Sequence, residues 1–325
     1  MPFRRSPKTG FLLIGRDFSI IQRKRPLFLI LKPTGGNGLT LVKIFADSIS
    51  DLPESWAAAY DIGIVPLYVV FGEAAYKDKL EITTADIYRR VEEDGVLPRT
   101  AAPAPADFIA AFTPWIEQGH TIVYISMSSK LSSTYQNALI AAAEFPEGRV
   151  HVVDSLNVSG GIALLVLKAA IAAKQGTGPS ELVGMLEEMR DRVEIEVLVD
   201  NLDYLHKGGR ASSVQHMIGS LLKIRPVLKV KEGLVISADK YRGKTEKAVE
   251  RMVHHFIDNV HKVDRELIIV AQTLAEKAAG FIRNTLLEKT DVKEVAIIEG
   301  GCAISCHCGP RTVAIMYLRQ PNCAL

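Results

Sequence analysis

Residues 120–144 read HTIVYISMSSKLSSTYQNALIAAAE, and this stretch decides the fold class. The mainly apolar run 121–125 predicts a buried strand, and the alanine-rich segment 135–144 predicts a helix. Between them, six of the nine residues at 126–134 carry a hydroxyl group. A strand that leads through a polar loop into a helix is typical of a parallel βαβ unit.

The same order of elements recurs through residues 41–175. Strands at 41–47 and 149–154 end at the pairs Asp47-Ser48 and Asp154-Ser155. Other elements are predicted as strand 62–71, loop 97–105, and helices 53–59, 83–93, 106–118 and 160–174. This alternation predicts a three-layer α/β/α domain with a mainly parallel sheet. Ligands of such sheets bind beyond the carboxyl ends of the strands, where the hydroxyl cluster lies.

Residues 176–325 show a different pattern, which predicts a second domain of the α+β class. Its elements are expected as strands 194–198, 225–230, 234–238, 266–271, 294–298 and 312–318, and helices 179–192, 246–259 and 277–288. Residues 231–233 predict a hairpin turn between two of these strands. We place the change of domain near residue 176.

Residues 1–40 form a basic leader with eight Lys and Arg against one acidic residue, a net charge of +7, and we expect it to be disordered. The remaining 31 basic and 36 acidic residues give residues 41–325 a net charge of −5. An acidic body argues against nucleic acid as the partner. No apolar run reaches the roughly 18–20 residues that span a bilayer, so no stable membrane insertion is expected. No secretory signal is recognised either, and we expect a cytoplasmic protein.

All four cysteines lie in the last 24 residues, three of them in CAISCHC at 302–308. A structural zinc site usually has two ligand pairs separated by a loop, and this spacing does not provide them. We expect a loop between two strands, with reduced cysteines that pack as small core residues. No metal and no cofactor are predicted.

The hydroxyl cluster at 126–134 has two interpretations. Backbone N–H groups and the helix dipole at a strand-to-helix junction favour an anion, and Ser or Thr hydroxyls add donors. Alternatively, one hydroxyl caps the helix and the others are solvated. The G-x-S-x-G, P-loop, G-x-G-x-x-G and HExxH motifs are all absent. Donors without an evident base or metal fit carboxylate binding better than catalysis.

Eight stretches carry a resemblance to a known family. They are ADSISDLP (46–53), IVPLYVVF (64–71), LPRTAAPAPADF (97–108), SSKLSSTYQNA (128–138), VHVVDS (150–155), LDYLHKGGRAS (202–212), GSLLKIRPVLKVKEG (219–233) and SCHCGPRTVAIMY (305–317). In this order, from about residue 41 to about residue 318, the chain resembles the DegV family of bacterial fatty-acid-binding proteins. The resemblance implies an α/β/α domain and a second mixed domain, with one fatty acid held between and within the two.

The resemblance also implies a site and a partner. The acyl chain would lie in an apolar tunnel, with its carboxylate bound by Thr100, Ser132 and His307, and with Ser133 as a further candidate. A fatty acid kinase would phosphorylate the bound carboxylate, and the carrier would pass on the acyl-phosphate for phospholipid synthesis. The carrier itself would have no catalytic activity. Because they fall on family motifs, Arg210 and Arg242 are either contacts to the kinase or phosphate, or ordinary surface residues.

Three residues depart from the family pattern. Ala101 replaces a serine after the loop threonine, Ser133 replaces a glycine, and Arg311 stands where a glycine is expected. Arg311 could reach the carboxylate or point into solvent.

Two rival functions belong to other classes. One is an acyl hydrolase that uses Ser132 as nucleophile and His307 as base. The other is a regulatory DNA-binding module, with residues 208–222 as a helix-turn-helix, which the acidic body opposes.

Overall fold

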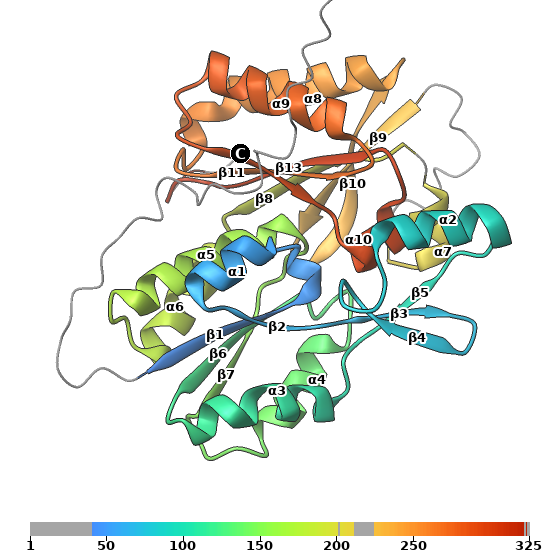
Figure 1. Cartoon of the computed structure of the whole chain (residues 1–325). Coiled ribbons are helices and arrows are strands. Elements are labelled where there is room, and N and C mark those ends of the chain that lie inside the picture. The colour runs from blue at the N-terminus through green and yellow to red at the C-terminus, as the bar shows by residue number, and fades with distance from the viewer. Residues whose placement is uncertain (1–40, 201, 211–223, 322, 324–325) are drawn as a thin grey trace, which may run out of the picture.

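The computed structural model describes residues 41–200, 202–210, 224–321 and 323 (Figure 1). The basic leader 1–40 and nearly all of the segment 208–222 considered as a helix-turn-helix lie outside the described residues. Within the described residues, no helix is long and apolar enough to cross a membrane. In the same part of the chain, no group of three or more His, Cys, Asp or Glu residues is placed to hold a metal ion.

A four-stranded parallel sheet forms the centre of the first half. Its order is β2-β1-β6-β7, built from β1 (Val42–Asp47), β2 (Gly63–Val65), β6 (Thr121–Ser126) and β7 (Val150–Asp154). One face packs against α3 (Pro105–Glu117) and α4 (Thr134–Ala142), and the other against α1 (Glu54–Tyr60), α5 (Gly160–Lys174) and α6 (Pro179–Arg190). Alternate residues of β1 point to opposite faces of the sheet. Phe45 belongs to the core on the side of α3 and α4, and Ile44 and Ala46 belong to the core on the side of α1, α5 and α6. The predicted three-layer arrangement is confirmed.

The predicted single strand at 62–71 is wrong, because the chain divides there between two sheets. Pro66, which has no backbone N–H to contribute to a ladder, follows β2. The next residue, Leu67, donates its N–H to the Ser48 hydroxyl at 3.0 Å. The chain then enters a three-stranded antiparallel sheet of order β4-β3-β5, formed by β3 (Tyr68–Phe71), β4 (Ala74–Lys77) and β5 (Arg99–Ala101). The predicted loop at 97–105 therefore contributes a short strand that carries Thr100.

A six-stranded mixed sheet forms the second half, in the order β10-β9-β8-β13-β11-β12. Its strands are β8 (Val193–Leu198), β9 (Ile224–Lys231), β10 (Leu234–Arg242), β11 (Ile268–Thr273), β12 (Val295–Glu299) and β13 (Thr312–Leu318). The hairpin at 231–233 is confirmed: Glu232 and Gly233 both have positive φ, as a two-residue turn of type I′ requires. The outer face is covered by α8 (Thr245–Asn259) and α9 (Glu276–Lys289), at the top of Figure 1.

Helix α5 lies between the two large sheets. It contacts β1 and β6 on one side and β8, β11 and β13 on the other. Ten of its residues are buried, and one continuous apolar core includes side chains from both sheets. The following helix α6, which begins after the proposed boundary near residue 176, packs against β6 and β7. The two halves are therefore joined through a common core rather than through a surface contact.

The cysteine segment forms helix α10 (Cys302–Cys308), so the predicted loop is wrong there. The physical reason is the spacing of its apolar side chains, since Cys302 and Cys306 are one helical turn apart and pack together beside Ile87 of α2 (Thr84–Asp94). All four cysteines are free. Cys302 and Cys306 are buried core residues as expected, whereas Cys308 and Cys323 are partly exposed.

The close approach of α5 to the second sheet gives a first prediction. A Cβ at Gly160 would lie 2.7 Å from Ile269 Cγ2 and 2.8 Å from Met316 Sδ. We expect Gly160→Ala to lower the free energy of unfolding by about 1–3 kcal/mol, because an overpacked core must shift. Urea denaturation measures this change.

The matched control is Gly184→Ala in α6, where an added Cβ would meet nothing within 4 Å. We expect this control to be neutral or stabilising by up to about 1 kcal/mol, since alanine favours a helix. Equal destabilisation by both substitutions would contradict the close packing of α5.

Candidate functional site

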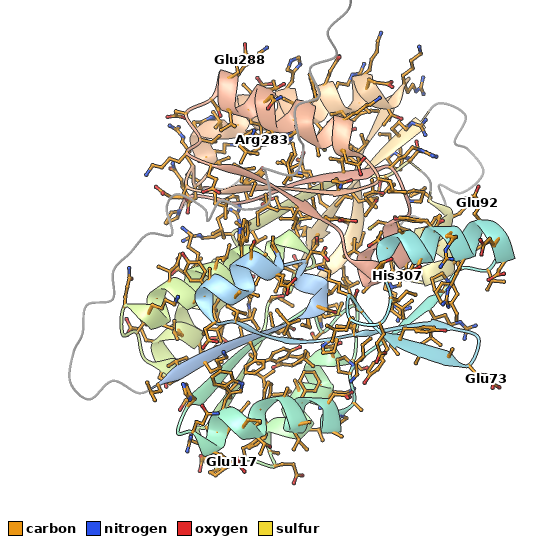
Figure 2. The ribbon with its side chains drawn as sticks, in the orientation of Figure 1. Glu73, Glu92, Glu117, Arg283, Glu288 and His307 are labelled. Atoms are coloured by element: carbon orange, nitrogen blue, oxygen red, sulfur yellow. The ribbon has the colours of Figure 1, made fainter. Side chains whose placement is uncertain are left out.

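Thr100 and His307, which are 207 positions apart in the sequence, meet where the two halves join. Thr100 Oγ1, on β5, lies 2.8 Å from His307 Nε2, on α10. Figure 2 shows His307 between the small sheet below it and α2 beside it. A hydroxyl and an imidazole that share a hydrogen bond can together present a donor to an anionic oxygen.

Helix α7 (Asp203–Gly208) packs against the other edge of the His307 ring. A Cβ at Gly208 would lie only 2.3 Å from His307 Nδ1. This nitrogen is buried and has no hydrogen-bond partner in the described part of the chain. Burial, and next the positive charge of Arg210, lower the pKa of His307 to about 4. The imidazole is therefore neutral at pH 7.

Ser132 lies at the start of α4 and bonds to its own helix. Its Oγ is 2.8 Å from Thr134 Oγ1 and accepts the Thr134 backbone N–H at 3.2 Å. Ser133 occupies the N-cap position, is exposed, and makes no capping hydrogen bond through its side chain. Ser132 therefore satisfies one N–H group at the start of α4, although Ser133 and not Ser132 holds the N-cap position. Its role and that of Ser133 in carboxylate binding stay predictions.

A contact not anticipated from the sequence joins α4 to the loop that carries Thr100. Asn137 donates its side-chain amide N–H to the carbonyl oxygen of Pro103 at 2.7 Å. Both residues fall within stretches that resemble the family, at 97–108 and 128–138. Nothing in the local sequence pattern, however, predicts that the two are in contact. This bond connects the Ser132 helix to the Thr100 loop.

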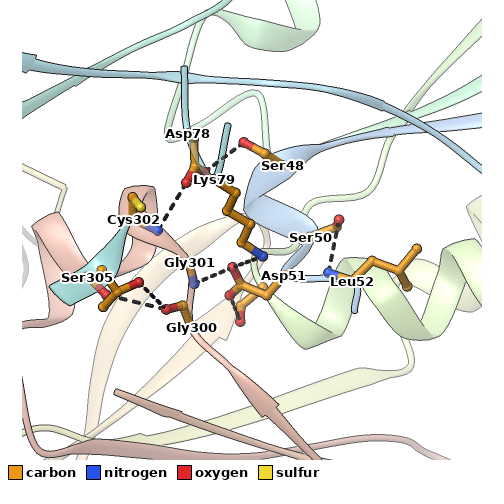
Figure 3. A network of polar contacts seen from close by, with 12 residues as sticks. Ser48, Ser50, Asp51, Leu52, Asp78, Lys79, Gly300, Gly301, Cys302 and Ser305 are labelled. Atoms are coloured by element: carbon orange, nitrogen blue, oxygen red, sulfur yellow. Dashed lines mark hydrogen bonds and ion pairs between the residues drawn. The ribbon is translucent and has the colours of Figure 1, made fainter. Parts of the chain in front are cut away.

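The N-terminus of α10 is held by two carboxylates from the first half of the chain (Figure 3). Asp51 Oδ1 accepts the Gly301 N–H at 2.8 Å, and Asp78 Oδ1 accepts the Cys302 N–H at 3.1 Å. These N–H groups have no partner within the helix, and negative charge there also complements the helix dipole. The helix that carries His307 is therefore fixed at its start by residues far from it in sequence.

The same carboxylates are tied to the first half. Asp51 Oδ2 accepts the Ser159 hydroxyl at 2.5 Å, and Lys79 Nζ lies 3.6 Å from Asp51 Oδ1. Asp78 Oδ2 accepts the Ser48 hydroxyl at 2.7 Å. Burial raises the pKa of Asp51 to about 6 even though its three donors oppose that change. From the sequence, Asp51 was identified only as part of the stretch ADSISDLP at 46–53, and Asp78 and Lys79 were missed.

Asp47, at the carboxyl end of β1, is completely buried. Its Oδ2 accepts the Tyr124 hydroxyl at 3.0 Å and the Met127 N–H at 2.8 Å. Its Oδ1 has no hydrogen-bond partner among the described residues. Burial is the main reason why the pKa of Asp47 is raised to about 7.

The three arginines from the sequence analysis lie in different surroundings. Arg210 is exposed and donates to the Gly208 carbonyl oxygen at 2.7 Å, and Arg242 is exposed at the end of β10. Arg311 forms an ion pair with Asp200, which also contacts Arg225 at 3.1 Å. Arg311 has a φ of 59°, in the left-handed region, which explains why a glycine is expected at this position. Arg311 is exposed, so of its two predicted alternatives the structure has the solvent-facing one, with Asp200 as a partner at the surface.

A sequence model of a protein family, described as "Uncharacterised protein, DegV family", matches residues 41–320 of the chain. The chain belongs to the DegV family. A curated DegV relative, a fatty acid-binding protein from Thermotoga maritima, is 34% identical over 277 residues, covering 84% of this chain and 96% of that protein. A DegV domain-containing protein from Clostridium perfringens is 33% identical over 279 residues, covering 86% of this chain and 99% of that protein.

Solved structures of DegV proteins share the fold. A fatty-acid-binding DegV family protein from Thermus thermophilus aligns with a TM-score of 0.80 at 32% identity, covering 86% of this chain and 100% of that one. DegV from Bacillus subtilis, described as a fatty acid binding protein, aligns with a TM-score of 0.76 at 26% identity, with the same coverage. The predicted fold class and family are thereby confirmed.

The raised pKa of Asp47 predicts how stability depends on pH. From about pH 4 to about pH 7 the unfolded chain releases the Asp47 proton while the folded chain keeps it, so this group lowers stability as pH rises. At about 1.4 kcal/mol per pKa unit, the total is on the order of 4 kcal/mol. We expect the stability of Asp47→Asn relative to the unsubstituted protein to increase with pH across this window. Urea unfolding at several pH values measures it.

The control is Asp94→Asn, because Asp94 is exposed at the end of α2. Its difference from the unsubstituted protein should be small at every pH. If the free energy of unfolding of Asp47→Asn differs from that of the unsubstituted protein by the same amount at every pH in this window, Asp47 is ionised in the folded state.

Proposed function

We propose that this DegV protein binds a long-chain fatty acid and holds its carboxylate at Thr100 and His307, with Ser132 and Ser133 as further donors. The observation that carries the proposal is the 2.8 Å hydrogen bond between Thr100 and His307 at the joint of the two halves. It is supported by the relatives that are described as fatty acid binding. Thr100 and His307 were taken from the resemblance, and their meeting agrees with the role it implies.

The chemistry of the site fits a fatty acid. Hydroxyl donors and a neutral imidazole can bind a carboxylate while leaving one oxygen free to react, which an arginine fork would oppose. The acyl chain would lie in an apolar tunnel between and within the halves. At about 0.8 kcal/mol per buried CH₂, a tail of about 16 carbons offers on the order of 10 kcal/mol before the costs of binding.

The proposal includes a partner. The bound acid would be presented to a fatty acid kinase, which forms the acyl-phosphate used in phospholipid synthesis in the cytoplasm. Arg210 and Arg242 are exposed and could contact the kinase or the transferred phosphate. In this scheme the DegV protein is a carrier without a cofactor or catalytic activity of its own.

The alternative of an acyl hydrolase is less well supported. A serine nucleophile must lie within hydrogen-bond reach of its base. Here His307 Nε2 is bonded to Thr100, and the Ser132 hydroxyl is bonded to Thr134. The geometry favours binding over hydrolysis.

The binding site is tested by two substitutions at one position. We expect Thr100→Val, which removes the hydroxyl and keeps the shape, to weaken fatty acid binding at least tenfold, because a polar partner of the carboxylate is lost. Thr100→Ser keeps the hydroxyl and should bind within a few-fold of the unsubstituted protein. Native mass spectrometry and titration with a fluorescent fatty acid measure both. The proposal fails if the unsubstituted protein neither carries nor takes up a long-chain acid.

The kinase contact is tested separately. We expect Arg242→Gln to bind fatty acid normally but to support slower acyl-phosphate formation by a bacterial fatty acid kinase, because one positive contact is removed. The control is Lys289→Gln, an exposed charge at the end of α9 on the outer layer. Equal rates for the two variants would exclude Arg242 from the contact.

A further inference from the structure

The two ring nitrogens of His307 lie in opposite surroundings. Nε2 is 2.8 Å from Thr100 Oγ1, so it has a polar partner. Nδ1 is buried and has no hydrogen-bond partner in the described ranges. A neutral imidazole carries its one proton on either nitrogen, and hydrogen bonding decides which.

The surroundings of Nδ1 are set by the contact of α7 with α10. A Cβ at Gly208 would lie 2.3 Å from Nδ1 and 3.1 Å from Cε1 of the ring, so the bare backbone of α7 packs against this edge. A second glycine allows the close contact between α7 and α10, because a Cβ at Gly309, just after α10, would lie 2.6 Å from the ring of Tyr204 on α7. Only glycine at position 208 leaves the ring in the place where its other edge meets Thr100.

Burial then decides the position of the proton. Among backbone groups, a buried N–H without a partner is rarer than a carbonyl oxygen that lacks one, and we apply the same order to the two ring nitrogens. A proton on Nδ1 would be such an unpaired donor, whereas a proton on Nε2 has Thr100 Oγ1 as its acceptor. The low pKa of His307 agrees with a ring that carries a single proton.

We propose that His307 carries its proton on Nε2 and donates it to Thr100 Oγ1, so that the Thr100 hydroxyl hydrogen is directed to the head group of the ligand. Of the two residues proposed to hold the carboxylate, Thr100 is then the donor that the ligand meets, whereas His307 acts by orienting the Thr100 hydroxyl and Gly208 by positioning the His307 ring. The direction of the ligand bond rests on the proposed function, whereas the tautomer does not. A hydroxyl that donates in this place binds a carboxylate or another head group with a free oxygen lone pair. It does not bind an ammonium head group, which has no lone pair to accept the hydrogen bond.

The tautomer is tested by ¹⁵N NMR of the ligand-free full chain labelled in its histidine rings. The chain has eight histidines, and the spectrum of His307→Gln assigns the signals of His307 by difference. We expect a protonated Nε2 and an unprotonated Nδ1 near neutral pH. A protonated Nδ1 would overturn the proposal.

Gly208→Ala tests the role of α7. We expect its methyl group to displace the ring, mix the two tautomers and weaken fatty acid binding at least tenfold. The matched control is Gly280→Ala within α9, where a Cβ meets nothing within 4 Å, and it should change neither measurement. A Gly208→Ala protein that keeps a pure Nε2 tautomer and full affinity would refute the positioning role.

Thr100 provides the second, independent variant pair. Thr100→Ser should keep the Nε2 tautomer, and Thr100→Val should lose it because the acceptor is gone. Retention of the pure Nε2 tautomer in Thr100→Val would contradict the direction of the bond. If the unsubstituted protein shows the Nε2 tautomer but binds no fatty acid, the proposed function fails and the tautomer stands. A long-chain amine that binds as tightly as the acid would overturn the direction assigned to the Thr100 donor.

Discussion

The hydrogen bonds from the start of α10 to Asp51 and Asp78 are the constraint on which the site depends. Gly301 and Cys302 belong to the second half of the chain, and both carboxylates belong to the first. A helix of seven residues has little stability of its own, so its direction must come from such contacts. With its first turn held in this way, α10 places His307 about 1.4 turns after Cys302 and against Thr100. The common core around α5 keeps the two halves in register behind it.

The contact between the two halves at the start of α10 buries the acidic groups of Asp51 and Asp78. An ionised carboxylate away from water is destabilising unless donors surround it. Asp51 has the Gly301 N–H, the Ser159 hydroxyl and Lys79, and Asp78 has the Cys302 N–H and the Ser48 hydroxyl. Removal of one donor would leave a buried charge, so these residues act as a unit. Gly301 leaves room for Lys79 beside Asp51, since a Cβ there would lie 2.3 Å from Lys79 Cε and the lysine side chain would have to shift.

Local pattern predicted the parallel sheet because β1, β6 and β7 are short apolar runs followed by capping residues and helices. It failed where tertiary contacts decide: Pro66 divides one apolar run between two sheets, and α10 is helical because its cysteines pack against α2. Thr100 and His307 came from the resemblance alone. No pattern in a single sequence pairs a threonine and a histidine that are 207 positions apart, or predicts that Gly208 packs against the ring.

Burial raises the pKa of a carboxylic acid and lowers the pKa of a histidine, because it disfavours the charged form of each. Both effects occur in this protein. His307 titrates near pH 4, below its usual range, so the folded chain gains stability from it as pH rises toward the usual value. Asp47 and Asp51 titrate near pH 7 and pH 6, above their usual range, so their contribution falls as pH rises. Between about pH 5 and about pH 6, His307 is mainly neutral and Asp47 is largely protonated, although in the unfolded chain both groups are mostly charged there. These two groups thus lose charge on folding, and above about pH 5 an uncharged imidazole lies against the Thr100 hydroxyl.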